Sequence, residues 1–130
     1  MAEPLKKGDR EIRDAELTSV PNQYPGREYE VSISLPEFTC KCPITGYPDF
    51  ATIHVTYGPD KDIVELKSLK LYINRFRDQH HFHEAVVNRI LDDLVACIRP
   101  RWMRIEGDFN PRGNVKTVVR VEYRPSEKKP

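Results

Sequence analysis

The 130-residue sequence has no excess of charge of either sign, because 21 Lys and Arg residues face 20 Asp and Glu residues. Nothing in this balance favours binding to nucleic acid or to an anionic membrane surface. The sequence also has no run near the roughly 20 apolar residues that a membrane helix needs, and its first ten residues do not resemble a signal peptide. We therefore expect a cytoplasmic protein with a small-molecule substrate, no direct contact with nucleic acid and no membrane association.

Cysteine is scarce, with only Cys40, Cys42 and Cys97. An odd number fits no closed disulfide framework and suits a reducing compartment in which at least one thiol is kept for chemistry. The chain is also too short to hold a separate dinucleotide-binding domain beside its own core. Any nucleotide cofactor must therefore bind without a Rossmann unit.

The distribution of proline, charge and apolar residues divides the chain into three parts. Residues 1–29 carry three prolines and many charges, which predicts a mobile or loosely docked arm. Residues 30–124 have regular hydrophobic periodicity and form the predicted domain. Residues 125–130 are expected to be a frayed tail.

Within the domain the hydrophobic period changes twice. Period two predicts strands over residues 31–35, closed by Pro36, and over residues 51–57. Period 3.6 then predicts a helix from Leu69, capped by Ser68, and a second helix over residues 86–98, with Cys97 in its core. Period two returns over residues 102–109 and 115–123, with a turn at residues 110–113. This order predicts an α+β fold, in which two helices cover one face of an antiparallel four-stranded sheet.

The stretch from Cys40 to Phe50 carries the residues most suited to chemistry. Cys42 and Asp49 are seven residues apart, and Pro43 and Pro48 stiffen the segment between them. A thiolate is a strong side-chain nucleophile and a carboxyl group can supply a proton. Cys42 could instead be a buried structural thiol, and Asp49 could be an ordinary turn residue after Pro48.

Three separated motifs resemble the NADPH-dependent 7-cyano-7-deazaguanine reductase family. They are Cys42-Pro43-x-Thr45-Gly46-x-Pro48-Asp49-Phe50, the segment Glu65-Leu66-Lys67-Ser68-Leu69-Lys70-Leu71-Tyr72, and Phe82-His83-Glu84. The resemblance covers roughly residues 30–124, and three motifs in order are more specific than any one alone. It implies a tunnelling fold that assembles as a homo-oligomer, commonly two stacked pentamers, with active sites at subunit interfaces. It also implies reduction of the nitrile of 7-cyano-7-deazaguanine to an aminomethyl group with two NADPH, in the biosynthesis of the tRNA nucleoside queuosine.

The resemblance assigns roles to five side chains. Cys42 adds to the nitrile to form a covalent thioimide, Asp49 donates a proton to the nitrile nitrogen, and His83 is a second proton relay. Glu84 accepts hydrogen bonds from an amino group and a ring N–H of the deazaguanine, and Phe82 packs on its ring. Glu84 could otherwise be a charge favoured at a helix start, and Phe82 a core residue.

The resemblance also implies a binding segment for NADPH: Glu65, Leu66, Lys67, Ser68, Lys70 and Tyr72, with Arg112 from an Arg-Gly-Gly element of the family. As a bare pattern, Lys67 and Lys70 would be solvated charges and Glu65 a surface acid. Two departures from the family stand out, since Asn114 replaces the second glycine after Arg112 and Tyr47 stands where Gln is common.

Two other functions remain open from the sequence. A relative of the reductases passes ammonia to the same thioimide, although the segment at residues 65–72 argues against it here. A non-catalytic purine-binding oligomer would leave Cys42 incidental. No bound metal is expected, because the spacing of Cys40, Cys42 and the four histidines matches no closed zinc pattern. His80 and His81 are expected to be exposed loop residues.

Overall fold

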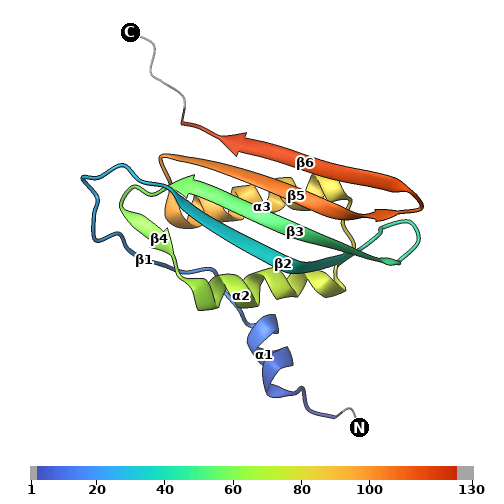
Figure 1. Cartoon of the computed structure of the whole chain (residues 1–130). Helices are drawn as coiled ribbons and strands as arrows, with labels where there is room; N and C mark the ends of the chain where they lie inside the picture. Colours follow the sequence, from blue (N-terminus) through green and yellow to red (C-terminus); the bar gives the residue numbers. More distant parts are fainter. Residues whose placement is uncertain (1–2, 126–130) are drawn as a thin grey trace.

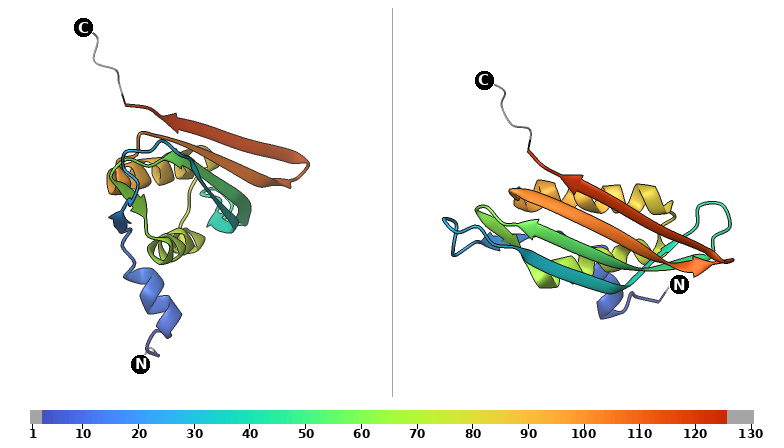
Figure 2. Two further views of the ribbon diagram at one scale, coloured as in Figure 1. Left: turned by 60° about the vertical axis from the view of Figure 1, so that its left-hand side comes forward. Right: turned by 45° about the horizontal axis from the view of Figure 1, so that its top comes forward.

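A computed structural model describes residues 3–125 and contains one antiparallel four-stranded sheet covered on one face by helices (Figures 1 and 2). The strand order is β2-β3-β5-β6. The predicted order of strand, strand, helix, helix, strand, strand is confirmed for the sheet and its two main helices. The sheet strands and these helices are β2 Val31–Lys41, β3 Pro48–Gly58, α2 Leu66–Asn74, α3 His83–Ile98, β5 Trp102–Arg112 and β6 Val115–Tyr123. The additional elements are α1 Lys7–Arg13, β1 Ser19–Pro21, β4 Asp62–Val64 and the 3-10 helix η1 Arg75–Asp78.

The core lies between the sheet and the helices, as the two hydrophobic periods require. Alternate residues of β3 and β5, such as Ile53 and Ile105, are fully buried, and so is Ile90 of α3. Gly107 of β5 allows α3 to approach the sheet, because a Cβ atom there would lie 2.5 Å from Cγ2 of Val87. The helix that carries His83 and Glu84 is therefore fixed firmly against the sheet.

A β-bulge extends β2 beyond its predicted end. The prediction that Pro36 closes this strand was wrong, because pairing with β3 resumes after a register shift between Leu35 and Phe38. The extra residue reverses the alternation of side chains, so Phe38 and Cys40 face the helices as Leu35 does. The strand thereby continues to the Cys42 loop with Cys40 on its buried side.

A second bulge lies in β5, between Phe109 and Arg112. The predicted turn at residues 110–113 was misplaced, since the two-residue loop is Gly113–Asn114, with φ of 58° and 71°. A two-residue type I′ hairpin turn requires positive φ at both of its residues, and Asn is among the residues that tolerate positive φ. The bulge turns Arg112 to the same face of the sheet as Phe109.

Helix α2 is capped by Glu65, not by Ser68 as predicted. The Glu65 carboxylate accepts hydrogen bonds from the backbone N–H of Lys67 at 3.2 Å and of Ser68 at 2.6 Å. The Ser68 hydroxyl donates to the Glu65 carbonyl at 2.7 Å. The helix therefore starts three residues earlier than predicted, at Leu66.

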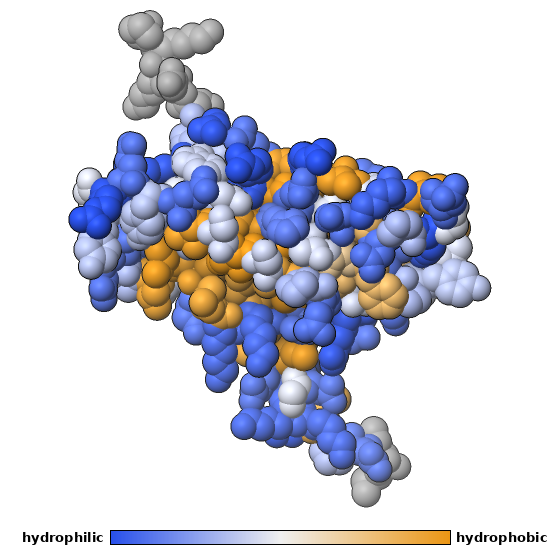
Figure 3. All heavy atoms as spheres, in the orientation of Figure 1, coloured by the Kyte–Doolittle hydropathy of each residue, from blue (hydrophilic) through white to orange (hydrophobic). Residues whose placement is uncertain are grey.

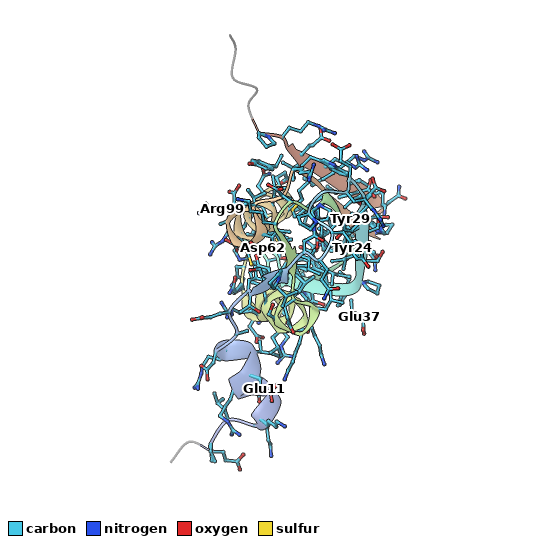
Figure 4. The ribbon with its side chains drawn as sticks, turned by 90° about the vertical axis from the view of Figure 1, so that its left-hand side faces the viewer. Glu11, Tyr24, Tyr29, Glu37, Asp62 and Arg99 are labelled. Atoms are coloured by element: carbon cyan, nitrogen blue, oxygen red, sulfur yellow. The ribbon has the colours of Figure 1, made fainter. Side chains whose placement is uncertain are left out.

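Part of the segment predicted as a flexible arm, residues 1–29, contacts the domain. Strand β1 pairs with β4, and the buried Asn22 donates from Nδ2 to the Asp60 carbonyl at 2.7 Å. The Arg75 guanidinium donates to the Ala15 carbonyl. Figure 4 shows Tyr24 and Tyr29 of this segment near each other, on the opposite side of the view from Arg99. Within the predicted tail, residues 126–130 lie outside the described residues.

Replacing Arg99 with glycine is expected to raise the free energy of unfolding by about 1 kcal/mol. Arg99 follows α3 in the left-handed region, with φ 44° and ψ 62°, and its N–H bonds to the Val95 carbonyl. Glycine adopts this conformation without the steric cost of a Cβ atom. Chemical denaturation measures the change. Arg89→Gly, within the same helix, is the matched control and should lower the free energy of unfolding by about 1 kcal/mol. A lower free energy of unfolding in Arg99→Gly as well would contradict the prediction.

Candidate active site

One end of the sheet holds a small hollow where three parts of the chain meet. They are the loop between β2 and β3, the start of α3 and the end of β5, at the right of Figure 1. The hollow has a volume of about 170 Å³. It is lined by Cys42, Pro43, Asp49, His81, Phe82, His83, Glu84 and Arg112. All five residues predicted to be catalytic or substrate-binding therefore lie together.

The loop that carries Cys42 is closed by its own backbone. The Cys42 N–H donates to the Tyr47 carbonyl at 2.9 Å, and the Gly46 N–H donates to the Cys42 carbonyl at 2.9 Å. Gly46 has φ 76°, a conformation that glycine adopts readily. Pro43 within this turn and Pro48 directly after it restrict the backbone further, so Cys42 is presented by a largely pre-ordered segment.

The environment of Cys42 favours the thiolate. Its pKa is lowered from its ordinary value to about 6, chiefly by a hydrogen bond from the Thr45 hydroxyl. The backbone N–H groups of Thr45 and Ile44 and the Arg112 guanidinium add to this effect. At neutral pH the sulfur is then mostly ionised, which is the form that acts as a nucleophile.

Cys40 is two residues away and has the opposite character. It is fully buried, and burial, followed by the negative charge of Asp49, raises its pKa to about 12. A neutral, inaccessible thiol of this kind is a packing residue. Of the two thiols, Cys42 is therefore the one suited to act as a nucleophile.

Asp49 lies at the centre of the hollow. Its side chain is only 7% exposed, with Oδ1 at 2.6 Å from Arg112 Nη1 and Oδ2 at 3.1 Å from His83 Nε2. The His83 ring stacks on Phe109 with 3.8 Å between centroids and 7° between planes. A buried carboxylate in contact with a fixed imidazole can exchange a proton with it.

Phe82 and Glu84 stand at the mouth of the hollow. Phe82 immediately precedes α3 and is 52% exposed, so it is not the core residue that its apolar character allowed. Glu84 is exposed in the first turn of the helix. Its carboxylate has no hydrogen-bond partner within residues 3–125. Both side chains are thus available to an incoming molecule.

The predicted cofactor segment lies apart from the hollow, because none of the lining residues comes from residues 65–72. Three of its members are engaged within the chain. Glu65 caps α2, Ser68 accepts from the Thr18 N–H at 3.1 Å, and Tyr72 donates to Asp93 Oδ2 at 2.6 Å. Burial of Tyr72, with this bond, raises its pKa above the ordinary value. The members exposed to solvent are Leu66, Lys67 and Lys70.

His81 was not recognised as a site residue from the sequence, and Arg112 was assigned to the cofactor rather than to this hollow. His81, predicted to be exposed, is partly buried, with Nε2 at 2.7 Å from Gln79 Oε1 and its ring against Phe76. Burial is the main reason that its pKa is lowered. The segment is held by backbone bonds between Lys41 and both Gln79 and His81, a long-range contact with no local sequence signal. Arg112 was predicted to bind cofactor, but its position beside Asp49 depends on the bulge.

Two classes of feature are absent from the described part of the chain. No group of three or more His, Cys, Asp or Glu residues within residues 3–125 is arranged to hold a metal ion. Over the same residues no helix is both long enough and apolar enough to cross a membrane.

The family model described as "QueF-like protein" matches residues 48–128. A protein of Synechocystis sp. named "NADPH-dependent 7-cyano-7-deazaguanine reductase" is 64% identical over 118 residues, covering 91% of this chain and 86% of its own length. A protein of Microcystis aeruginosa with the same name is 56% identical and covers 92% of each chain. A Synechococcus protein, again with this name, is 62% identical and covers 89% of this chain and 90% of its own.

A solved structure shares the fold. It is described as "the archaeosine synthase QueF-Like in the apo form" and superposes with a TM-score of 0.66, covering 77% of this chain and 96% of that one. The two sequences are 17% identical, so this likeness bears on the fold alone. It confirms the predicted tunnelling-fold architecture of the sheet and helices.

Proposed function

Since the chain belongs to the QueF-like protein family, we propose that it is an NADPH-dependent oxidoreductase that converts the nitrile of 7-cyano-7-deazaguanine to an aminomethyl group. The names of relatives at 56–64% identity over most of the chain support the reaction. The observation that carries the proposal is the Cys42 thiol with a pKa near 6, in one hollow with Asp49 and His83. The three free cysteines of the chain suit a protein of the reducing cytoplasm.

The proposed mechanism begins with the Cys42 thiolate. Its sulfur adds to the nitrile carbon, and the nitrogen takes a proton from the Asp49–His83 pair to give a thioimide. NADPH, when bound, supplies a hydride to this carbon, and a second NADPH supplies another. Between these steps the carbon–sulfur bond breaks, which returns the electron pair to Cys42 and leaves an imine. His83, beside Asp49 at 3.1 Å, is placed to return protons to Asp49 between steps.

Glu84 and Phe82 are proposed to hold the substrate. The deazaguanine presents an amino group and a ring N–H side by side, and one carboxylate can accept from both. The Glu84 carboxylate, which has no partner among the described residues, is suited to this pairing, which would disfavour analogues that lack those donors. Exposed Phe82 offers a flat apolar surface to the ring.

Leu66, Lys67 and Lys70 are proposed to contact NADPH. The two ammonium groups project from the first turns of α2, and cations at such a position suit phosphate groups. Glu65, Ser68 and Tyr72 would serve the same site indirectly, since their side chains fix the start and the buried face of this helix.

The active site is proposed to be completed by another copy of the chain. A hollow of about 170 Å³ is smaller than the few hundred Å³ typical of a ligand pocket. Strands β2 and β6 are the two edges of the sheet, and both have half-buried apolar residues on the helix side. These are Val31, Ile33 and Leu35 on β2, and Val119, Val121 and Tyr123 on β6. Figure 3 shows hydrophobic atoms at the surface between the sheet and α2.

Pairing β2 of one copy with β6 of the next would cover both edges and build a ring. Because β2 and β6 would be antiparallel, the neighbour's Gly113–Asn114 turn would lie beside the Cys42 loop. We propose two stacked pentameric rings, as the family resemblance implies, with each site between subunits.

Two alternatives make different predictions for one spectroscopic experiment. A reductase forms a thioimide with an absorbance band that disappears when NADPH is added. An enzyme that transfers ammonia would lose the band with ammonia instead, and a purine-binding module would form none. The exposed lysines of α2 favour hydride transfer, and the lowered pKa of Cys42 favours an enzyme over a binding module.

Lys67→Ala and Lys70→Ala should each raise the NADPH concentration for half-maximal rate about tenfold, because each removes a charged contact to phosphate. Thioimide formation should be unchanged, since it precedes hydride transfer. Steady-state kinetics with NADPH and NADH measure the first effect, which should be larger for NADPH, and stopped-flow absorbance measures the second. Lys61→Ala, which removes an exposed lysine before β4, outside both α2 and the hollow, is the control. Unaltered NADPH kinetics in both variants would remove α2 from the cofactor site.

A further inference from the structure

Arg112 reaches the hollow only because of the β5 bulge. It is three residues after Phe109, so strict alternation would turn it to the open face of the sheet. Phe109 pairs with Thr117 of β6, and Arg112 pairs with Val115. Three steps along β5 thus match two steps along β6, so the bulge inserts one residue into β5. Arg112 therefore faces the same side as Phe109 and Asp49. Bulges beside active sites commonly re-aim a side chain in this way.

The Arg112 guanidinium contacts Asp49 from the solvent side. Its Nη1 donates to Asp49 Oδ1 at 2.6 Å, and its side chain is 46% exposed while that of Asp49 is 7% exposed. The other carboxylate oxygen faces His83 at 3.1 Å. A guanidinium has five N–H donors, so one bond to Asp49 leaves others for a second acceptor. Cys42 lines the same hollow, and its ionised sulfur is the second acceptor for the Arg112 guanidinium.

We propose that Arg112 is a positioning residue of the active site, which holds the Asp49 carboxylate and the ionised Cys42 sulfur together. The inference deepens the proposed function and rests on it for the chemistry that follows. Arginine suits the role because it stays charged and presents donors in a planar fork, whereas lysine offers only a point charge. The pKa of Cys42 is lowered chiefly by the Thr45 hydroxyl and further by Arg112, and Cys42 in turn raises the pKa of Arg112.

This role differs from the cofactor contact that the family resemblance implied for Arg112. A cofactor residue would leave the ionisation of Cys42 unchanged and would alter the response to NADPH. A positioning residue would alter the ionisation of Cys42 in the absence of any cofactor. The other titratable groups of the hollow are common to both cases: Asp49, His81, His83 and Glu84, with buried Cys40 behind them.

The test measures the pH dependence of Cys42 alkylation by iodoacetamide, without substrate or NADPH, in a Cys97→Ser background. The unmodified site should react with a midpoint near pH 6. In Arg112→Gln the midpoint should rise by about one pH unit, so that the rate at pH 6 falls about fivefold. Arg112→Lys should keep a midpoint between the two, because it retains the charge but not the fork. Arg120→Gln, which removes an arginine paired with Glu106 on the open face, is the matched control.

Three outcomes would overturn the inference. The first is an unchanged alkylation midpoint in Arg112→Gln, and the second is an equal shift in Arg120→Gln. The third is a raised NADPH requirement in Arg112→Lys with an unchanged midpoint, which would assign Arg112 to the cofactor. Because alkylation needs neither substrate nor cofactor, a protein that shows the shift but fails to reduce the nitrile would overturn the proposed function and leave this role intact.

Discussion

Cys42→Ala is expected to abolish covalent capture of the substrate and to lower nitrile reduction by at least about 10³-fold. Among residues 3–125, Cys42 carries the only thiol that lines the hollow, and its pKa near 6 makes it mostly thiolate at neutral pH. Without it the nitrile has no nucleophile and the covalent route is closed. Mass spectrometry after incubation with substrate, without NADPH, should show the adduct in the unmodified protein and none in the variant.

Two controls separate this loss from damage to the fold. Cys97→Ser removes a half-buried thiol of α3 and should retain both the adduct and the activity. Calorimetric titration of Cys42→Ala should still detect substrate binding, because Glu84 and Phe82 are untouched. An adduct of the same mass in Cys42→Ala would assign the nucleophile to another residue and would leave the loop at residues 40–50 without its proposed role.

The hydrophobic periods were sufficient to predict the sheet and the two main helices, because half-buried strands and helices impose different spacings on apolar residues. The bulges could not be predicted. Pro36 reads as the end of a strand, yet β2 continues past it, since pairing with β3 resumes beyond Leu35. Pairing of this kind depends on the neighbouring strand, and no local pattern reports it.

Local sequence patterns also failed to predict the positions of a helix cap and of a turn. Serine is a preferred N-cap residue and glutamate is not, so propensity favours Ser68 over Glu65. Glu65 takes the role because its longer side chain folds back to the N–H groups of Lys67 and Ser68. The Gly113–Asn114 turn was displaced in the prediction because Pro111 is a frequent turn residue, whereas here it lies within β5.

The candidate site was predictable where its residues are adjacent in the sequence. Cys42 and Asp49 lie in one loop, and Phe82, His83 and Glu84 are consecutive. That these two segments share one hollow follows from the fold, since the start of α3 lies beside the end of β2. Arg112, 63 residues after Asp49, joins them through the β5 bulge. The family element at Arg112 indicated a cofactor role, but no local pattern predicts the bulge or the contact with Asp49.

Asp49→Asn is expected to slow thioimide formation and turnover by about 10²- to 10⁴-fold, the usual contribution of a positioned proton donor. Asparagine has nearly the same shape, and its amide oxygen can still accept from Arg112. Its amide nitrogen cannot pass a proton to the nitrile or take one from His83, which lies 3.1 Å from Asp49 Oδ2. Substrate affinity should change little, because Glu84 and Phe82 make the proposed contacts to the ring. Stopped-flow absorbance of the thioimide measures the rate, and calorimetry in a Cys42→Ala background measures the affinity.

Asp108→Asn is the matched control for this substitution, because Asp108 also lies in the sheet and also pairs with a cation, Lys116, but away from the hollow. It should leave thioimide formation unchanged. Asp49→Asn should also destabilise the fold only modestly, since the Arg112 side chain is 46% exposed and water can solvate the charge that loses its partner. If Asp49→Asn formed the thioimide at the unmodified rate, Asp49 would be an anchor for Arg112 and His83 rather than a proton donor. His83→Gln would then carry the large effect, because the imidazole would be the group that protonates the nitrile nitrogen.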